Sequence, residues 1–131
     1  MNNQEIIRFD IKTTPITKKN SSQIVMNQKT GKPYIIPSPA YRKFEKAAGW
    51  LIPGRFRNLQ ISSPVNVKCV YYMPTRRRVD LVNLQEATLD ILVKYGVLED
   101  DNYNIVASMD GSRVCYDPSN PRTEVTIQFL E

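Results

Sequence analysis

The chain has 131 residues, of which 41% are hydrophobic and 24% are charged, and its formal net charge is +5 at pH 7. This length suits one domain with its own core and is too short for two ordinary ones, so we expect a single domain over residues 1–131. No apolar run approaches the roughly 18 residues of a membrane span, and the N-terminal sequence MNNQEIIRFD lacks the pattern of a secretory signal. We therefore expect a soluble, cytoplasmic protein that makes no membrane contact.

The residue types present limit the available chemistry. The chain contains no histidine, and its two cysteines, Cys69 and Cys115, lie in apolar contexts without metal-binding spacing. A histidine general base, a Ser-His-Asp triad and a histidine-ligated zinc site are therefore excluded, and we expect two buried free thiols. Any catalyst must use carboxylates, lysines, hydroxyls or a metal ion held by oxygen atoms. The excess of positive charge favours a polyanionic partner.

The N-terminal part of the chain predicts short strands and basic loops. Residues 5–11 alternate partly between polar and apolar side chains, which is typical of a strand. A loop over residues 13–23 carries Lys18 and Lys19, and a second short strand covers residues 24–26. The sequence NQKTGKP then predicts a turn with two lysines. These lysines are equally compatible with a solvated hairpin tip and with phosphate contacts.

A first helix is predicted after the sequence PSP. Ser38 is placed as its N-cap and Pro39 as its first residue. The sequence AYRKFEKAAGWLI continues the helix and gives it an apolar face that packs on a sheet. The residues of this face are Tyr41, Phe44, Ala48 and Leu51. At this spacing Trp50 belongs to the core or its edge rather than to a base-stacking site.

The second half of the chain completes an α+β pattern. Residues 65–73 are the clearest strand, and the amphipathic helix that follows ends at Gly96. Residues 103–109 and 113–116 predict the two strands of a hairpin around an Asp-Gly turn, and residues 123–130 predict a closing strand. Two helices and about five strands in this order predict a two-layer α+β domain, in which two main helices cover one face of a small mixed β-sheet.

The second helix and its flanks carry the residues best suited to chemistry. Three consecutive arginines, Arg76, Arg77 and Arg78, precede it and suit backbone phosphates. Without histidine, phosphodiester hydrolysis usually employs divalent metal ions held by carboxylates. The best candidate ligands are Asp80, Glu86 and Asp101. The last of these joins the others only if the chain returns to the N-terminal end of the helix. Each acid also has an ordinary interpretation as a partner of the helix dipole, a solvated face or a turn residue.

The sequence MPTRRRVDLVNLQEATLDILVKYGVLEDDNYNIV resembles the RusA family of Holliday junction resolvases. The family motif has a methionine-proline strand end, basic residues, Asp-Leu-x-Asn-Leu, a helix, and a glycine turn into Leu-x-Asp-Asp. TPITKKNS and PSPAYRKFEKAA are also similar to the family's pattern, so the resemblance covers residues 13–129. It implies a homodimeric endodeoxyribonuclease, often carried by phages and prophages, that resolves four-way DNA junctions by paired nicks in recombination and repair. It also implies dependence on Mg²⁺, which Mn²⁺ is expected to replace, and no small-molecule cofactor.

The resemblance assigns roles to individual acids. Asp80 matches the first catalytic aspartate and Asp101 the later one, with Asp100 beside it as a further metal ligand. Val82 stands where the fuller pattern has a second aspartate, and Glu86 stands where it has a lysine. An acid gained within reach of an acid lost favours a compensated metal site, with Glu86 as a ligand, over an inactive one.

DNA contacts are expected mainly with phosphates, because junction enzymes recognise the shape of the branch. The arginine run is expected to bind the phosphates of the DNA backbone, and Asn83 is expected to contact either a residue that holds the metal or a phosphate. The lysines that are candidates to replace the family lysine are Lys18, Lys19 and Lys94.

Two other functions remain open from the sequence. One is a catalytically weak or inactive protein that binds branched DNA in a phage replication or recombination system. The other is a single-strand or RNA binder that stacks bases on Trp50, Tyr71 and Tyr72.

Overall fold

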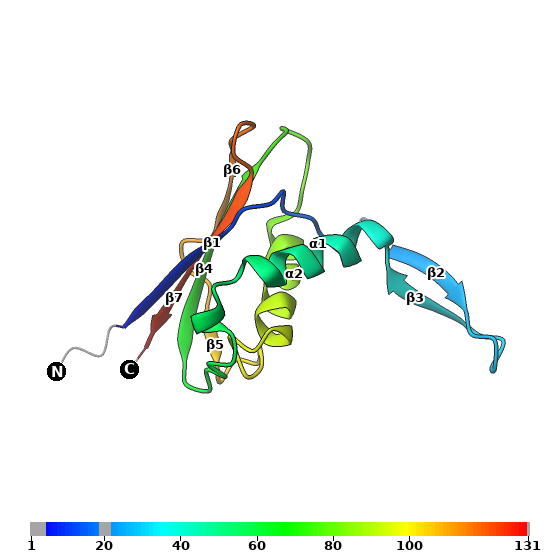
Figure 1. The fold of residues 1–131 in the computed structure, drawn as a ribbon, viewed down its shortest axis with the longest axis horizontal. Coiled ribbons are helices and arrows are strands. Elements are labelled where there is room, and N and C mark those ends of the chain that lie inside the picture. The colour runs from blue at the N-terminus through cyan, green and yellow to red at the C-terminus, as the bar shows by residue number, and fades with distance from the viewer. Residues whose placement is uncertain (1–4, 19–21, 131) are drawn as a thin grey trace.

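The computed structural model describes residues 5–18 and 22–130 of the chain. Its α+β fold consists of a main sheet, two helices on one face of that sheet, and a two-stranded hairpin that extends away from them (Figure 1). The elements in chain order are β1 (Ile6–Ile11), β2 (Ser22–Met26), β3 (Pro33–Pro37), α1 (Pro39–Leu51), the 3-10 helix η2 (Gly54–Phe56), β4 (Val65–Met73), α2 (Leu81–Lys94), β5 (Val106–Ser108), β6 (Arg113–Tyr116) and β7 (Arg122–Phe129).

The main sheet is mixed, as the sequence predicts. Its order begins β1-β7-β4, and these three strands pair antiparallel. Both β5 and β6 pair in parallel with the other edge of β4, β5 near its start and β6 along its last four residues. The expected hairpin of residues 103–109 with 113–116 is therefore wrong. The turn at Gly111, whose φ is +88°, carries the chain onward along β4 instead of back on itself.

Between β5 and β6, hydrogen bonds to side chains take the place of backbone pairing along that edge. The Ser112 hydroxyl accepts a hydrogen bond from the backbone N–H of Cys69 at 3.0 Å, and the Asn66 side chain accepts one from the N–H of Asp110 at 2.8 Å. These bonds satisfy backbone donors that a continuous strand would otherwise pair. Local turn chemistry alone does not reveal such partners, which explains the error in the prediction.

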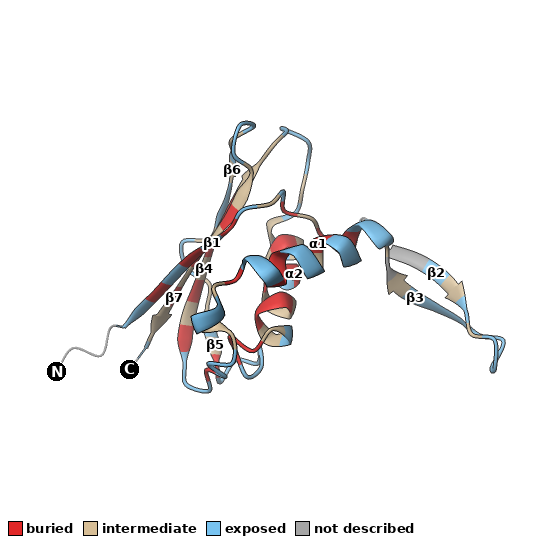
Figure 2. Ribbon diagram, viewed as in Figure 1, coloured by how far each residue is buried: buried red, intermediate tan, exposed pale blue. Residues whose placement is uncertain are grey.

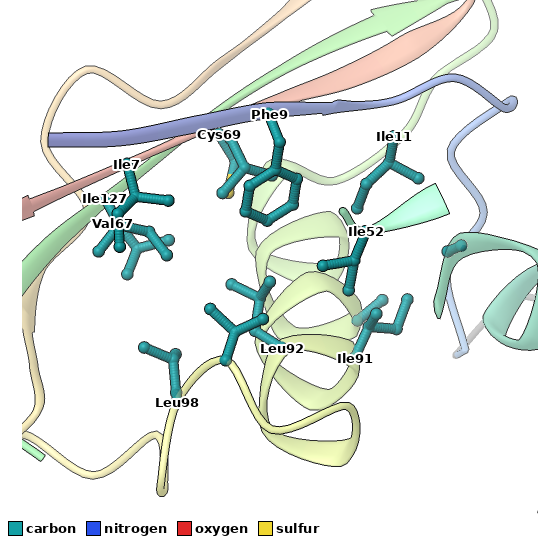
Figure 3. Packing of buried hydrophobic residues seen from close by; sticks show 14 of the residues in the cluster. Ile7, Phe9, Ile11, Ile52, Val67, Cys69, Ile91, Leu92, Leu98 and Ile127 are labelled. Atoms are coloured by element: carbon teal, nitrogen blue, oxygen red, sulfur yellow. The ribbon is translucent and has the colours of Figure 1, made fainter. Parts of the chain in front are cut away.

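The core lies between the sheet and the helices. Alternate residues of β4, Val65, Val67, Cys69 and Tyr71, are buried, and Val70 is buried as well, while Asn66 and Lys68 are half-buried. Figure 3 shows how side chains from β1, β4 and β7 meet residues of α2 and of the segments that follow each helix. Full burial of such a side chain contributes about 1.5–3 kcal/mol. Figure 2 shows the buried segments gathered in this layer.

Helix α1 begins as predicted but faces the core differently. The Ser38 hydroxyl accepts a hydrogen bond from the N–H of Tyr41 at 3.1 Å, which confirms the N-cap. Leu51 and Trp50 are 41% and 70% exposed, so their expected core positions are wrong. Trp50 follows Tyr41 by nine residues, which places it about 180° away around the helix. The core positions are taken instead by Gly49 and by the residue after the helix.

Other expectations of burial are confirmed in part. Cys69 is a free, buried thiol, whereas Cys115 is free but only half-buried. Tyr71 is 1% exposed and therefore cannot offer its ring to a nucleotide base. Among the described residues, no helix is long and apolar enough to cross a membrane.

Candidate nucleic-acid interface and active site

The arginine run lies in the loop that joins β4 to α2, at one end of the main sheet (Figure 1). We call residues 74–80 the arginine loop. All three arginine side chains are exposed. Together with β6 the loop lines an open cleft of about 370 Å³, to which Met73, Thr75, Arg76, Arg77, Arg78, Val79, Val114, Cys115 and Tyr116 contribute.

Tyr116 of β6 supports this loop. The guanidinium carbon of Arg76 lies 4.0 Å from the centre of the Tyr116 ring, within the range of a cation–π contact. A guanidinium stacked in this way keeps its N–H groups in its own plane, where they can reach phosphate oxygens. The cleft therefore combines positive charge with an aromatic wall, which suits the backbone of a nucleic acid.

Asp80 closes the arginine loop as the N-cap of α2. Its backbone oxygen accepts hydrogen bonds from the N–H groups of Asn83 and Leu84, but its carboxylate makes no capping bond to the helix. Instead the Asn83 amide donates to a carboxylate oxygen of Asp80 at 3.3 Å. Two predicted site residues are thus brought together. The side chain of Val82, two residues after Asp80, is 69% exposed.

The acidic turn after α2 lies near the C-terminal half of that helix. The Asp100 carboxylate accepts hydrogen bonds from the Asp101 N–H at 2.8 Å and from the Asn102 amide at 2.9 Å, and these bonds lower the pKa of Asp100. Partial burial raises the pKa of Asp101, and the negative charges of Asp100 and Asp90 raise it further. Asp90 follows Asp80 by ten residues, or about 15 Å along the helix axis. Asp101 therefore interacts electrostatically with a later turn of α2 than the one that begins at Asp80.

The polar face of α2 gathers several charged groups. Lys18, from the segment after β1, forms an ion pair with Asp90 at 2.5 Å. Lys94 pairs with Glu45 of α1, also at 2.5 Å. Of the lysines proposed to replace the family lysine, Lys18 is therefore the one beside an acid of α2's polar face, and Lys19 lies outside the described residues.

Tyr41 reaches this face from α1. Its ring is buried, and among the described residues its hydroxyl is the buried side-chain polar atom that lacks a hydrogen-bond partner. Burial raises its pKa. The carboxylates that raise it further are, in decreasing order, those of Glu45, Asp90 and Glu86. The predicted ligand Glu86 thus belongs to an acidic face shared with Asp90. Asp90 was not among the predicted ligands, although its spacing of four residues from Glu86 places both on one face of the helix.

The carboxylate oxygens are suitable ligands for a hard divalent cation, but the positions of these side chains are only partly suited to holding one. Oxygen donors are the ligands that Mg²⁺ prefers. Within residues 5–18 and 22–130, however, no three Asp, Glu or Cys side chains lie close enough together to hold a metal ion. Asp80, Glu86 and Asp101 form no such group in the single chain, so their joint role as ligands stays a prediction.

Comparison with known proteins finds one family that matches nearly the whole chain and several relatives that match parts of it. A family model described as Endodeoxyribonuclease RusA matches residues 12–128. The crossover junction endodeoxyribonuclease RusA of Aquifex aeolicus is 26% identical over 98 residues, which cover 75% of this chain and 74% of that protein. The corresponding protein of Enterobacteria phage 82 is 41% identical over 51 residues, and that of Escherichia coli K12 is 39% identical over 51 residues. These two alignments cover 39% of this chain and 42% of each relative.

Proposed function

Because the chain belongs to the RusA family of endodeoxyribonucleases, we propose that it is a metal-dependent endonuclease that resolves four-way DNA junctions in recombination and repair. One observation carries this proposal beyond family membership. The exposed arginine loop ends directly in Asp80, whose carboxylate is not used to cap the helix. Phosphate-binding groups and a carboxylate available for catalysis are therefore neighbours in space as well as in sequence.

The arginine loop supplies the DNA contacts of this proposal. Arg77 and Arg78 engage backbone phosphates at the cleft, while Arg76 is held against Tyr116. Contacts of this kind depend strongly on salt, because each neutralised phosphate releases condensed counterions. They recognise the shape of a branch through the positions of its phosphates and not through its bases.

The proposed metal ion is Mg²⁺, with Mn²⁺ as a substitute. Mg²⁺ in nucleic-acid enzymes often takes only one or two protein carboxylates and completes its shell with water and substrate phosphates. A group of three acids in the free chain is therefore not required. Asp80, Glu86 and Asp101 are the proposed ligands, with Asp100 beside the last. When bound, the metal supplies activation of the attacking water and neutralisation of charge on the phosphate.

The chain's own residues orient the reacting groups. Asn83 holds the Asp80 carboxylate through its amide. Lys18, already beside Asp90, is the proposed replacement for the family lysine and contacts the scissile phosphate once DNA is bound. Two strands of a junction must be cut symmetrically, so we propose that the active form is a homodimer in which the two copies together make the paired nicks.

The deciding experiment is the nicking of a synthetic four-way junction. The wild-type protein is expected to nick two opposite strands in Mg²⁺ or Mn²⁺, and Asp80→Asn is expected to bind the junction without nicking it. Asp110→Asn, at the exposed turn before β6, is the matched control and should nick like the wild type. Junction binding by the wild type without nicking in either metal would instead support a non-catalytic branched-DNA-binding protein.

A further inference from the structure

The hairpin of β2 and β3 stands apart from the rest of the fold. Figure 1 shows it extending from the start of α1, away from the main sheet. We call residues 22–37 the arm. Its strands have five residues each, so the ribbon reaches about 17 Å before the turn is counted. An isolated two-stranded hairpin is at best marginally stable in water, so packing against a further surface would stabilise the arm.

The turn at the tip of the arm is well defined. The Asn27 side chain accepts hydrogen bonds from the N–H groups of Lys29 at 2.8 Å and Thr30 at 3.1 Å. The backbone oxygen of Asn27 accepts another from Gly31, whose φ of +69° suits a residue without a side chain. This turn holds two exposed lysines, Lys29 and Lys32, at the far end of the arm.

One face of the arm is apolar and exposed. Ile24 lies directly opposite Ile35 in the register, so their side chains share a face, and Met26 lies on the same face two residues further along. Ile24 is 76% exposed, Ile35 71% and Met26 53%. Figure 2 shows the arm outside the layer in which the buried segments gather. Three large aliphatic side chains in water cost free energy, which a partner would recover.

The charge around the arm identifies the chemistry of that partner. From Ile11 to Phe44 the sequence contains no aspartate or glutamate. The basic residues of this stretch are Lys12, Lys18, Lys19, Lys29, Lys32, Arg42 and Lys43. A long segment with cations alone is complementary to a polyanion and would be repelled by the corresponding segment of another copy.

The size of the arm also argues against an interface between copies. A stable interface buries about 800 Å² on each partner, from roughly 20–30 residues. Among the side chains of the arm that the structure describes, the large apolar ones that are exposed are Ile24, Met26, Tyr34 and Ile35. A ribbon with so few such side chains is too small to hold a dimer, but a two-stranded ribbon fits a DNA groove.

We infer that the arm enters the branch point of a DNA junction, an inference that rests on the proposed function. Ile24, Ile35 and Met26 contact bases that are unstacked at the branch, as apolar wedges of other DNA-binding proteins do between base steps. Lys29 and Lys32 contact phosphates of the emerging arms of the junction. The arm thereby supplies preference for branched over linear DNA, whereas the arginine loop binds both.

Binding measurements on three variants test this inference. The substrates are a four-way junction carrying 2-aminopurine at the branch and a linear duplex of the same arm sequence. When the wild type unstacks bases at the branch, the fluorescence of 2-aminopurine is expected to rise. Ile24→Ser/Ile35→Ser is expected to abolish this rise, to weaken junction binding about tenfold and to change duplex binding little. Lys29→Ala/Lys32→Ala should lower the salt slope of junction binding by about 2. Ile6→Ser, an exposed strand isoleucine of β1, is the matched control.

The possible outcomes distinguish a failure of the inference about the arm from a failure of the proposed function. If the wild type does not prefer the junction over the duplex, the proposed function fails first. The inference about the arm is overturned if the wild type does prefer the junction and both arm variants show the same preference, the same fluorescence signal and the same salt slope as the wild type. A shift of the isoleucine variant from dimer to monomer in sedimentation would also overturn it, since the face would then join two copies. Should the isoleucine variant fail to fold, the lysine variant, altered only at exposed positions, still decides through its salt slope.

Discussion

Tyr71 of β4 and Thr88 of α2 share a hydrogen bond of 2.8 Å between their hydroxyl oxygens, inside the layer between sheet and helix. The Thr88 hydroxyl also donates to the backbone oxygen of Leu84 at 3.0 Å. Since a hydroxyl has one hydrogen, Tyr71 must be the donor to Thr88. Burial raises the pKa of Tyr71, so it keeps that hydrogen under all ordinary conditions. This bond fixes the helix that carries Asp80 and Glu86 against the sheet.

The two partners of this bond are expected to differ in their effect on stability. Tyr71→Phe removes the donor but leaves Thr88 bonded to Leu84, so it should cost about 1 kcal/mol. Thr88→Val takes away the oxygen that accepts the hydrogen bond of the buried Tyr71 hydroxyl and should cost more, about 1–3 kcal/mol. In the double variant the second substitution should add little. Urea unfolding measures all three, and equal costs for the two single variants would contradict the assignment of donor and acceptor.

Gly49 of α1 lies against the ring of Tyr95 at the end of α2. A Cβ atom placed there would lie 2.1 Å from the Tyr95 ring, so Gly49→Ala should destabilise the fold by about 1–3 kcal/mol despite its higher helix propensity. Gly54→Ala is the control, because a Cβ at Gly54 meets no atom within 4 Å. Combining Gly49→Ala with Tyr95→Ala should cost less than the sum of the two. Thermal unfolding that shows a stable Gly49→Ala would disprove this contact.

Asp117 should make the fold sensitive to acid. Hydrogen bonds from Arg122 and then from Ser119 hold the pKa of Asp117 below its usual value. A depressed pKa stabilises the folded state above the usual range of aspartate, and this contribution is lost as the pH falls through the lowered pKa. Asp117→Asn should therefore lose stability at pH 7 but much less at low pH. Urea midpoints across pH, with exposed Asp10→Asn as the control, measure the difference.

The arginine loop should act through phosphates. Replacing Arg77 and Arg78 together by alanine is expected to weaken binding to junction and linear DNA alike and to lower the salt slope by about 2. Lys46→Ala, an exposed change on α1, should leave the slope unchanged. A loss of affinity for the junction alone would assign branch recognition to this loop instead of the arm.

Glu86 and Val82 test the proposed compensation of the metal site. Glu86→Gln should reduce nicking at least about 100-fold while junction binding persists. Val82→Asp restores an acid at an exposed position and should raise the nicking rate without a large cost in stability. Nicking by Glu86→Gln at the wild-type rate would remove this residue from the site. Asp90→Asn would then be the next acid to measure.

Local sequence signals predicted the elements of this fold well, whereas contacts between distant elements were beyond them. Ser38 and Pro39 determine a helix start by their own chemistry, and the alternation of residues 65–73 is a property of one strand. Trp50 was misplaced although helical spacing puts it opposite Tyr41, because a large aromatic side chain was expected in the core whatever its position on the helix. The partner of β6 was missed because β4 lies about forty residues earlier in the chain.

The same limit applies to the site. The proximity of Asp80 and Asn83 follows from helical spacing and was predictable. The electrostatic effect of Asp90 on the pKa of Asp101 depends on the path of the chain after α2, which no local pattern specifies. The ion pair of Lys18 with Asp90 joins segments that only the tertiary fold brings together.

Because β5 and β6 both lie along one edge of β4, the spacing between these two strands sets the distance between the two ends of the proposed site. The chain leaves the acidic turn after α2, runs the length of β4 and delivers Tyr116 to Arg76 at the other end. One residue inserted between Ser108 and Arg113 would displace Tyr116 by about 3.3 Å while Asp101 stayed in place. The length of this short connection therefore sets the distance between the acidic turn and the arginine loop.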